Sequence, residues 1–465
     1  MSTPSATLRA SQGANAAPVS RARTILAGSV GNAVEWFDWT IYASFAIFFS
    51  KQFFPEGNET AALLATFGIF AVGFFMRPVG GWVLGIFSDR YGRKAALGLT
   101  ILMMAGGSLI IAITPTYATI GLAAPLLLTA ARLLQGLSLG GEYASATTFL
   151  AEMAPPNKRG FYSSFVFFSA AVGILAASAV GWLLTSTLTK AEMADWGWRI
   201  PFFLGALGGL AGMWIRRAVP ETEAFSHAKK AGVEKQPLRT LLREHPREVL
   251  RIVGFSILTT FAFYIFVAYV PTYAIRQVKA DPQVAFAANT VALIVFMLVQ
   301  PVFGMLSDRI GRKPQLIFFA AGYLVFFYPL MTTLGPSFGS ILAVELFGLV
   351  LYAMYTSIAP AIMSEQFPTS VRAVGIGTPY NLVVALLGGT TPYLLTWLQS
   401  KGMERWFFYY VLAGAVITLI TFIRMPETRG PIAQVRPAET RPSQALTPDL
   451  NAFRLRQDRK AFPFS

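Results

Sequence analysis

Charged side chains occur inside several long apolar segments of this sequence. They are Glu35, Asp38, Arg77, Arg132, Glu142 and Glu345. A charge at the centre of a bilayer costs about 3 kcal/mol on insertion scales, so a membrane segment retains one only where it has a partner or a task. A buried carboxyl group can carry a proton, and a guanidinium can bind a carboxylate through two parallel hydrogen bonds. These residue types therefore favour proton exchange and anion binding.

The segments around these charges are long enough to cross a membrane. Hydrophobic residues make up 54% of the chain and charged residues 13%, which is about half of the ~25% usual in soluble proteins. Each apolar run approaches the ~20 residues that span a ~30 Å hydrocarbon core. We predict twelve helices, over residues 24–50, 61–87, 95–114, 122–151, 161–186, 197–217, 248–276, 284–306, 314–334, 339–364, 372–399 and 405–424. The expected fold class is an all-α, polytopic membrane protein.

The basic residues are distributed unevenly between the two sides of such a bundle. With both termini on one side, the segments on that side hold 29 of the 38 Lys and Arg residues, and the opposite side holds seven. Cytoplasmic loops carry such an excess, so we expect both termini in the cytoplasm. The net charge of +15 then requires no nucleic-acid partner. The chain has no cysteine, which excludes disulfides. The polar residues before 24 indicate a cytoplasmic tail, with an Arg-rich transit peptide as the alternative.

Three motifs recur in the same order in the two parts of the chain. They are Gly85–Lys94 with Gly304–Lys313, the pair Glu152 and Arg159 with the pair Glu365 and Arg372, and Pro220–Thr222 with Pro426–Thr428. The recurrence predicts two pseudosymmetric halves of six transmembrane helices each. The predicted organisation is an N-terminal half at 24–217 and a C-terminal half at 248–424, a cytoplasmic linker at 218–247, and cytoplasmic tails at 1–23 and 425–465.

The repeated decapeptide resembles the signature of the major facilitator superfamily, and the similarity extends over nearly the whole chain. The resemblance implies that an Asp at one helix end and Arg groups at the next lock the cytoplasmic face, and that the lock breaks as the halves rock. The expected gating network is Asp89, Arg93, Glu152, Arg159, Asp308, Arg312, Glu365 and Arg372. The alternative is that the cations only anchor the loops on the inside.

Further motifs are similar to those of the metabolite:proton symporter family. They are Gly31–Asp38, Arg77–Gly81, Arg132–Tyr143, Trp196–Phe202, Phe296–Pro301 and Tyr355–Ile358. This family includes α-ketoglutarate, citrate, shikimate and proline/betaine permeases, and the similarity is greatest with the α-ketoglutarate permeases. The resemblance implies a multi-pass protein of the bacterial inner membrane that works as a monomer. It also implies that the proton gradient drives transport without a cofactor.

The intramembrane charges define the candidate site. At 1.5 Å per residue, Glu35, Arg77 and Glu142 lie about 15 Å deep, near the midplane. By the superfamily resemblance, helices 1, 4, 7 and 10 line a central cavity. We expect the substrate to contact Arg77, Arg132, Gln135, Tyr143, Tyr264 and Tyr355. The candidate proton carriers are Glu35, Asp38 and Glu142.

Structural roles remain open for the same residues. Glu35 with Arg77, and Arg132 with Glu345, could be ion pairs that only stabilise the fold. The glycines near Glu142 could serve close helix packing. These alternatives predict that conservative substitutions would leave transport unchanged.

The function expected from these features is proton-coupled symport of a small anionic metabolite. The expected substrate is a mono-, di- or tricarboxylate such as α-ketoglutarate, and the membrane and the proton are the other partners. A proline/betaine-type osmolyte or a shikimate-type substrate is the alternative, and antiport and sodium coupling also remain open. A membrane sensor that transports nothing is the alternative from another class. We expect no enzyme activity and no metal site, because the chain lacks a Walker loop and its two histidines lie outside the predicted spans.

Overall fold

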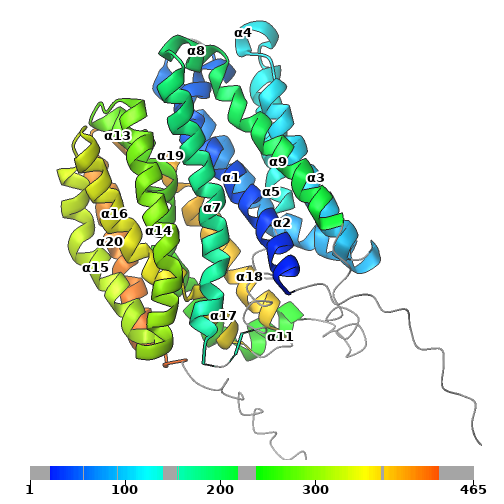
Figure 1. The fold of residues 1–465 in the computed structure, drawn as a ribbon, viewed down its shortest axis with the longest axis vertical. Coiled ribbons are helices and arrows are strands. Elements are labelled where there is room, and N and C mark those ends of the chain that lie inside the picture. The colour runs from blue at the N-terminus through cyan, green and yellow to red at the C-terminus, as the bar shows by residue number, and fades with distance from the viewer. Residues whose placement is uncertain are drawn as a thin grey trace, which may run out of the picture. The chain divides into compact units, whose positions relative to one another are not determined.

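The computed structural model describes residues 21–55, 57–91, 93–139, 154–155, 157–217, 237–367 and 371–428. Their regular secondary structure is entirely helical (Figure 1). The long helices before residue 218 are α1 (Arg21–Phe53), α2 (Glu59–Tyr91), α3 (Arg93–Ile113), α5 (Ala123–Ser138), α7 (Arg159–Thr187) and α9 (Ile200–Arg217). Three short helices connect some of them: α4 (Tyr117–Ile120), α8 (Lys190–Asp195) and η1 (Gly197–Arg199).

The remaining helices begin with α11, which lies inside the predicted linker. They are α11 (Pro237–Glu244), α12 (Pro246–Ala262), η2 (Phe263–Tyr269), α13 (Val270–Gln277), α14 (Pro282–Ile310), α15 (Arg312–Thr333), α16 (Phe338–Thr356), α17 (Ala359–Glu365), α18 (Arg372–Val383), η3 (Val384–Gly388), α19 (Thr391–Ser400) and α20 (Glu404–Arg424). Among the described residues, eight helical segments are long and apolar enough to cross a bilayer. Most of the helix ends predicted from the apolar runs are correct to within a few residues.

The long helices run alternately between two ends of the bundle (Figure 1). We call the end where α1 begins and α20 finishes the terminal end. We call the end that carries α4 and α8 the loop end. In Figure 1 the loop end is at the top and the terminal end at the bottom. The terminal end is the side that the charge distribution assigns to the cytoplasm.

Glycine residues allow two helices of the first half to pack with their backbones in direct contact. A Cβ atom on Gly136 of α5 would overlap the carbonyl group of Gly73 on α2, and one on Gly80 of α2 would overlap the carbonyl of Leu137. Small residues at such crossings let helices approach closely inside a membrane. The Gly-rich sequence around Gly136 therefore fixes the position of α5 against α2.

The predicted halves meet along α7 and α14, which lie side by side (Figure 1). Near the terminal end, a Cβ on Gly160 would lie 2.5 Å from the carbonyl oxygen of Gly304, and one on Gly304 would lie 2.6 Å from that of Gly160. Nearer the loop end, Ser178 forms a 3.0 Å hydrogen bond with Thr290. The contact between the two helices is therefore bare backbone at one end and polar at the other.

Two of the long predicted helices contain π-helical turns that apolar periodicity does not indicate. The turn η2 separates α12 from α13, and η3 follows α18. Each π-turn precedes a proline, which has no N–H group to donate to the carbonyl four residues earlier. Pro271 therefore leaves the carbonyl of Val267 without this hydrogen bond, and Pro392 leaves that of Gly388 without it. In both places the proline ring also crowds the carbonyl group. The helix widens by one residue at both places, and such π-turns frequently occur at functional sites.

Candidate functional site

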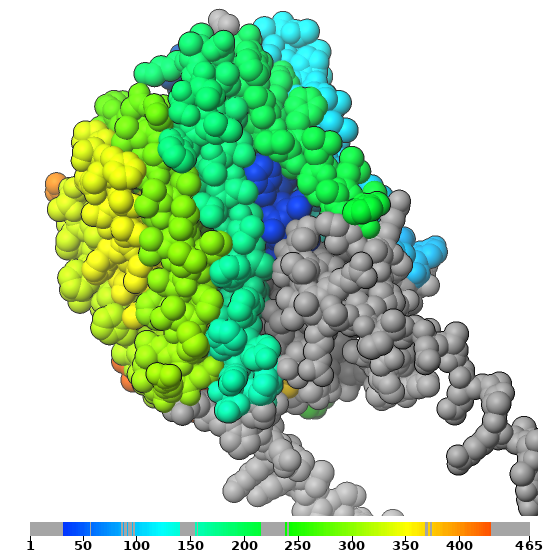
Figure 2. All heavy atoms as spheres, viewed as in Figure 1, coloured from blue at the N-terminus to red at the C-terminus, as the bar shows by residue number. Residues whose placement is uncertain are grey.

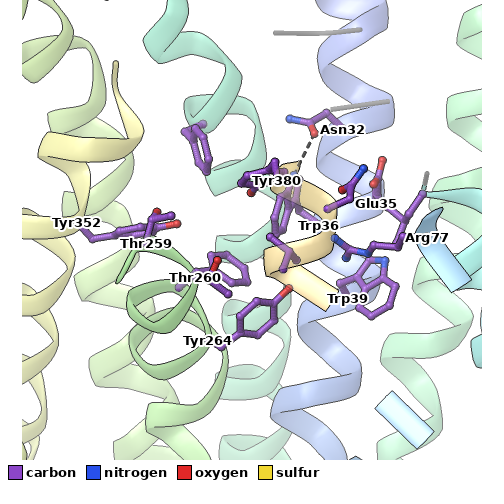
Figure 3. A pocket seen from close by; sticks show the side chains of 15 residues that line it. Asn32, Glu35, Trp36, Trp39, Arg77, Thr259, Thr260, Tyr264, Tyr352 and Tyr380 are labelled. Atoms are coloured by element: carbon purple, nitrogen blue, oxygen red, sulfur yellow. Dashed lines mark hydrogen bonds between the residues drawn. The ribbon is translucent and has the colours of Figure 1, made fainter. Parts of the chain in front are cut away.

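A pocket lies between the two predicted halves (Figure 3). The first half contributes Asn32, Glu35, Trp36, Trp39, Arg77, Leu139 and Phe167. The second half contributes Thr259, Thr260, Phe263, Tyr264, Tyr352, Tyr380, Asn381 and Val384. Figure 2 shows atoms of α1, the helix that supplies four of these residues, reaching the surface between α7 and α9. Both halves thus supply walls of a single pocket.

Arg77 supplies the positive charge in this pocket. It lies in the middle of α2, directly before Pro78, and its side chain is largely buried. The guanidinium carbon lies 4.1 Å from the ring centre of Phe74 and 4.6 Å from that of Trp39. Contacts of this kind with aromatic faces contribute about 0.5–2 kcal/mol. The rings hold the guanidinium in place beside the pocket that Arg77 lines.

The wall opposite Arg77 combines aromatic rings with hydroxyl groups. Tyr264, on η2, packs edge-on against Phe74, with ring centroids 5.4 Å apart, and lines the pocket together with Arg77. Tyr352 stacks on Phe296, with ring centroids 5.7 Å apart and planes at 4°. In Figure 3, Tyr264 and Tyr380 lie toward the Arg77 side of the pocket and Tyr352 lies across it. The second half therefore offers hydrogen-bond donors on rigid rings to whatever Arg77 binds.

Glu35 shares the pocket with Arg77. It lies on α1 between Asn32 and Trp36, whose side chains form a 3.0 Å hydrogen bond with each other. Asn32 also donates to the carbonyl of Val166 on α7, at 3.1 Å. Among the described lining residues, Glu35 is the only acid and Arg77 the only base. A ligand carboxylate would thus approach a site where one carboxyl group is already present.

A buried polar network lies behind the pocket, inside the first half. Asp38 accepts hydrogen bonds from Ser108 of α3 and from Gln135 of α5. Gln135 in turn accepts a 2.7 Å hydrogen bond from Arg132. The Arg132 guanidinium carbon also lies 3.9 Å from the ring centre of Trp39. Trp39 also lines the pocket, so this network adjoins the ligand space through the Trp39 ring.

The structure therefore distributes the predicted site residues over several places. Arg77, Glu35 and Tyr264 line the pocket as expected. Three further residues are fully or almost fully buried outside it: Arg132, Gln135 and Asp38. Tyr355 is also buried, against Phe255 and Phe319. Glu142 and Tyr143 fall outside the described residues.

The ion pair between Arg132 and Glu345, which was the structural alternative for these two residues, is absent among the described residues. Arg132 is held by Gln135 and by the faces of Trp39 and Tyr42, all within the first half. Glu345 lies on α16, fully buried, and neither of its carboxylate oxygens has a hydrogen-bond partner among the described residues. The position of each residue along its predicted helix did not determine the direction of its side chain.

Sequence reasoning did not identify several residues of this region. It missed Trp39, Asn32 and Ser108, which are ordinary neutral residues in apolar helices. One signal was available, because Trp39 follows Glu35 by four residues and Asn32 precedes it by three. Those spacings place all three side chains on one face of a helix.

A second cluster joins the halves at the terminal end. Asp308, near the end of α14, accepts hydrogen bonds from the backbone N–H groups of Gly160 and Phe161 at the start of α7, both at 2.9 Å. Arg312 of α15 donates to Asp308 at 2.8 Å. A carboxylate at a helix N-terminus satisfies free N–H groups and interacts favourably with the helix dipole. Asp308 therefore fastens α7 to the second half.

Glu365 completes this cluster from α17. Its carboxylate lies 3.8 Å from the guanidinium of Arg159 and 3.9 Å from that of Arg312. Glu365 therefore pairs with Arg159 across the halves. The predicted partner of Glu365 in its own half, Arg372, instead donates to the carbonyl of Phe367 at 3.3 Å. Glu152 lies outside the described residues, as do the side chains of Asp89 and Arg93.

The third repeated motif contributes to the same end of the bundle. The carboxylate of Glu427 accepts hydrogen bonds from the N–H groups of Arg312, at 2.9 Å, and Lys313, at 3.0 Å. Glu427 thus caps α15, the helix that carries Arg312. The recurrence of Pro-Glu-Thr in the sequence has a structural role in the second half, because it orients the helix that binds Asp308.

Comparison with known proteins places the chain in a family. The sequence profile of the Major Facilitator Superfamily matches residues 28–392. The D-xylose-proton symporter has a similar structure, with a TM-score of 0.70 at 20% identity over 88% of this chain and 99% of that one. The chain belongs to the major facilitator superfamily, and it has that superfamily's all-helical, two-half membrane fold.

Curated relatives are more similar in sequence. α-Ketoglutarate permease of Escherichia coli (strain K12) is 40% identical over 406 residues, which cover 86% of this chain and 93% of the permease. The citrate-proton symporter of Salmonella typhi is 35% identical, over 88% of this chain and 95% of that protein. The proline/betaine transporter of Salmonella typhimurium is 34% identical, over 90% and 86%. The chain thus resembles carriers of both anionic and zwitterionic metabolites.

Proposed function

We propose that this chain is a proton-coupled symporter that carries a small carboxylate across the bacterial inner membrane by alternating access. The observation that carries the proposal is Arg77. It is a guanidinium in the middle of a membrane helix, held between aromatic rings and directed into a pocket that both halves line. Its planar fork matches the two oxygens of a carboxylate. The 40% identity to an α-ketoglutarate permease supports a carboxylate as the substrate.

Coupling to protons follows from the charges in the pocket. Substrate carboxylate and Glu35 would share a single described cation, Arg77. Substrate binding is therefore easier when a proton neutralises Glu35, and proton binding is easier when substrate occupies Arg77. Such mutual reinforcement is a coupling free energy between two ligands, which symport requires. Asp38 is the second candidate carrier, because its carboxylate lies in a network that adjoins the pocket through Trp39.

Arg132 has a different task in this proposal. In the described conformation it does not reach the pocket, and it bonds with Gln135, which in turn bonds with Asp38. We assign Arg132 and Gln135 to positioning Asp38, and Arg77 to the substrate. This assignment modifies the expectation that both arginines bind the anion.

The terminal cluster supplies the gate. Asp308, Arg312, Glu365 and Arg159 tie α7 to the second half at the end that we assign to the cytoplasm. Their release would let the halves separate there and open the pocket to that side. Arg312 links Asp308 to Glu365, and Glu365 pairs with Arg159, which supports a gate closed at the terminal end in this conformation.

An osmolyte carrier is the second candidate function. The pocket presents one base and one acid among several aromatic rings. A zwitterion such as betaine would place its carboxylate on Arg77 and its quaternary ammonium against the rings, which bind such cations through their faces. The relatives include a proline/betaine transporter at 34% identity, which supports this alternative.

Transport in proteoliposomes tests the proposal. We would measure uptake of labelled α-ketoglutarate, citrate, shikimate and betaine with and without an inward proton gradient. We expect gradient-stimulated uptake of a carboxylate and its loss in Arg77→Ala. Betaine uptake alone would establish the osmolyte alternative. If folded protein carried none of the four, and proton flux did not respond to them, the proposed function would be refuted.

A further inference from the structure

A buried acid in the second half has no role in the scheme above. Glu345 lies on α16 with 0% of its surface exposed. Neither carboxylate oxygen has a hydrogen-bond partner in the part of the chain that the structure describes. The described ion pairs do not include it either. An ionised carboxylate without partners in an apolar interior is so costly that such groups are kept neutral. In this conformation Glu345 therefore holds a proton.

The elements packed against α16 offer it no counter-charge. Helices α12, α14, α15 and α17 and the turn η2 contact α16. Their charged residues lie at the terminal end: Arg247, Glu248, Arg251, Asp308, Arg309, Arg312, Lys313 and Glu365. Glu345 lies seven residues from the loop-end start of α16, about 10 Å along its axis. The charged ends are therefore far from it.

Tyrosines are the other titratable groups on these elements. They are Tyr264, Tyr269, Tyr323 and Tyr328. Tyr323 donates to the carbonyl of Gly348 at 2.8 Å, and Tyr269 bonds with Thr396 at 2.5 Å. Tyr264 faces Arg77, and Tyr328 stacks on Tyr409. None of these hydroxyl groups bonds to Glu345 in the described structure.

A continuous helix face connects Glu345 to the pocket. Glu345, Gly348 and Tyr352 follow one another at spacings of three and four residues, so they lie on the same face of α16. Tyr352 lines the pocket. Seven residues correspond to about 10 Å along the helix, which is the separation between Tyr352 and Glu345. Glu345 thus lies two turns from the pocket, toward the loop end.

The π-helical turn η2 covers the space between them. A Cβ on Gly348 would collide with the ring of Phe266, which belongs to η2. The same turn carries Phe263 and Tyr264, which line the pocket. A rearrangement of η2 on ligand release would therefore move the ring that shields the face between Tyr352 and Glu345. π-Turns occur frequently at sites that change conformation or bind ligands.

We propose that Glu345 is a proton-carrying group of the second half, and that η2 controls its access to water. The inference rests on the proposed symport. The acid holds its proton in the described conformation. When η2 moves, water enters past Phe266, the O–H bond of the acid breaks and the proton passes to that water. After the halves have rocked, the carboxylate takes up a proton from the opposite side and η2 closes again, so each cycle moves one proton and leaves the residue unchanged.

Two transport modes in proteoliposomes separate this role from a structural one. Net accumulation driven by a pH gradient requires the carrier to release its proton, whereas counterflow exchanges labelled for unlabelled substrate without net proton release. We expect Glu345→Gln to lose gradient-driven accumulation and to retain counterflow. Glu345→Asp, which keeps a titratable group, should retain both. Glu59→Gln, which removes an exposed carboxylate at the loop end, is the matched control and should behave like wild type.

Several results would overturn the inference. Accumulation by Glu345→Gln at the wild-type level would show that the proton of Glu345 never leaves. Loss of both modes in folded Glu345→Gln protein would show a structural role. If the Gln variant fails to fold, Glu345→Met replaces it, because the side chain has no described polar partner that methionine would leave unpaired. Failure of the proposed symport itself would already be visible in wild type, as uptake that ignores the gradient.

Discussion

Replacing Arg77 with lysine keeps the positive charge in the pocket but removes the planar guanidinium group with its paired N–H donors. Lysine also loses the flat contact with Phe74 and Trp39, whose ring centres lie 4.1 and 4.6 Å from the guanidinium carbon. If arginine holds the substrate carboxylate through two hydrogen bonds and lysine through one, the loss is one charge-assisted bond, about 1.5–3 kcal/mol. At 1.4 kcal/mol per factor of ten, we expect substrate affinity to fall roughly 10- to 150-fold.

Substrate binding to purified Arg77→Lys protein measures this loss directly. Isothermal titration calorimetry in detergent gives the Kd, and proteoliposome uptake gives the transport KM. The matched control is Arg405→Lys, because Arg405 is exposed at the start of α20, away from the pocket. Its affinity should remain at the wild-type value. An unchanged Kd in Arg77→Lys would refute the bidentate contact and would leave Arg77 as a structural charge.

Three further predictions concern the proton network, helix packing and the gate. Asp38→Asn should abolish the stimulation of uptake by a pH gradient, because the carboxylate of Asp38 is the acceptor of the buried network. Stimulation at the wild-type level would exclude Asp38 as a proton carrier. Gly136→Ala should destabilise the protein by about 1–3 kcal/mol, measured by thermal unfolding in detergent, because its methyl group would overlap α2. Gly106→Ala is its control, since the nearest atom would lie 3.9 Å away, and equal melting of the two variants would contradict the packing argument. Asp308→Ala should open the terminal end, because it frees the N–H groups of α7. A cysteine at the pocket position 260, Thr260→Cys, is then the sole thiol of the chain and reports the opening. In inside-out vesicles it should react faster with an impermeant maleimide when Asp308→Ala is also present, and an unchanged rate would argue against a gate.

The sequence was sufficient to predict where the membrane helices lie. Long apolar runs dominate such segments, and their ends are marked by charged residues such as Arg312 and Glu404. The breaks in these helices were not predicted. Pro271 lies in the seventh predicted helix, but whether a helix kinks, ends or widens at proline depends on what its neighbours allow. The π-turn η2, which carries part of the pocket, could therefore not be read from periodicity.

The candidate site was predicted in part, for a similar reason. The depth rule predicted that Arg77 and Arg132 lie within the membrane, and both side chains are buried in the protein. It could not decide which one faces the pocket, since that depends on the rotation of each helix in the bundle. The predicted gating network shows the same limit. Asp308 and Glu365 were identified from repeated motifs, but the pairing of Glu365 with Arg159 depends on how the halves meet.

The direct backbone contact between Gly160 and Gly304 is a position at which substitutions could control the conformation of the protein. Each glycine occupies the space in which the other would place a side chain, since an added Cβ would lie 2.5–2.6 Å from the facing carbonyl oxygen. A tryptophan at either position would act as a wedge and would hold the terminal end apart. Gly160→Trp or Gly304→Trp should therefore trap a single conformer, with the pocket accessible from one side of the membrane. Such a trapped form would suit the selection of conformation-specific antibody fragments for structural studies.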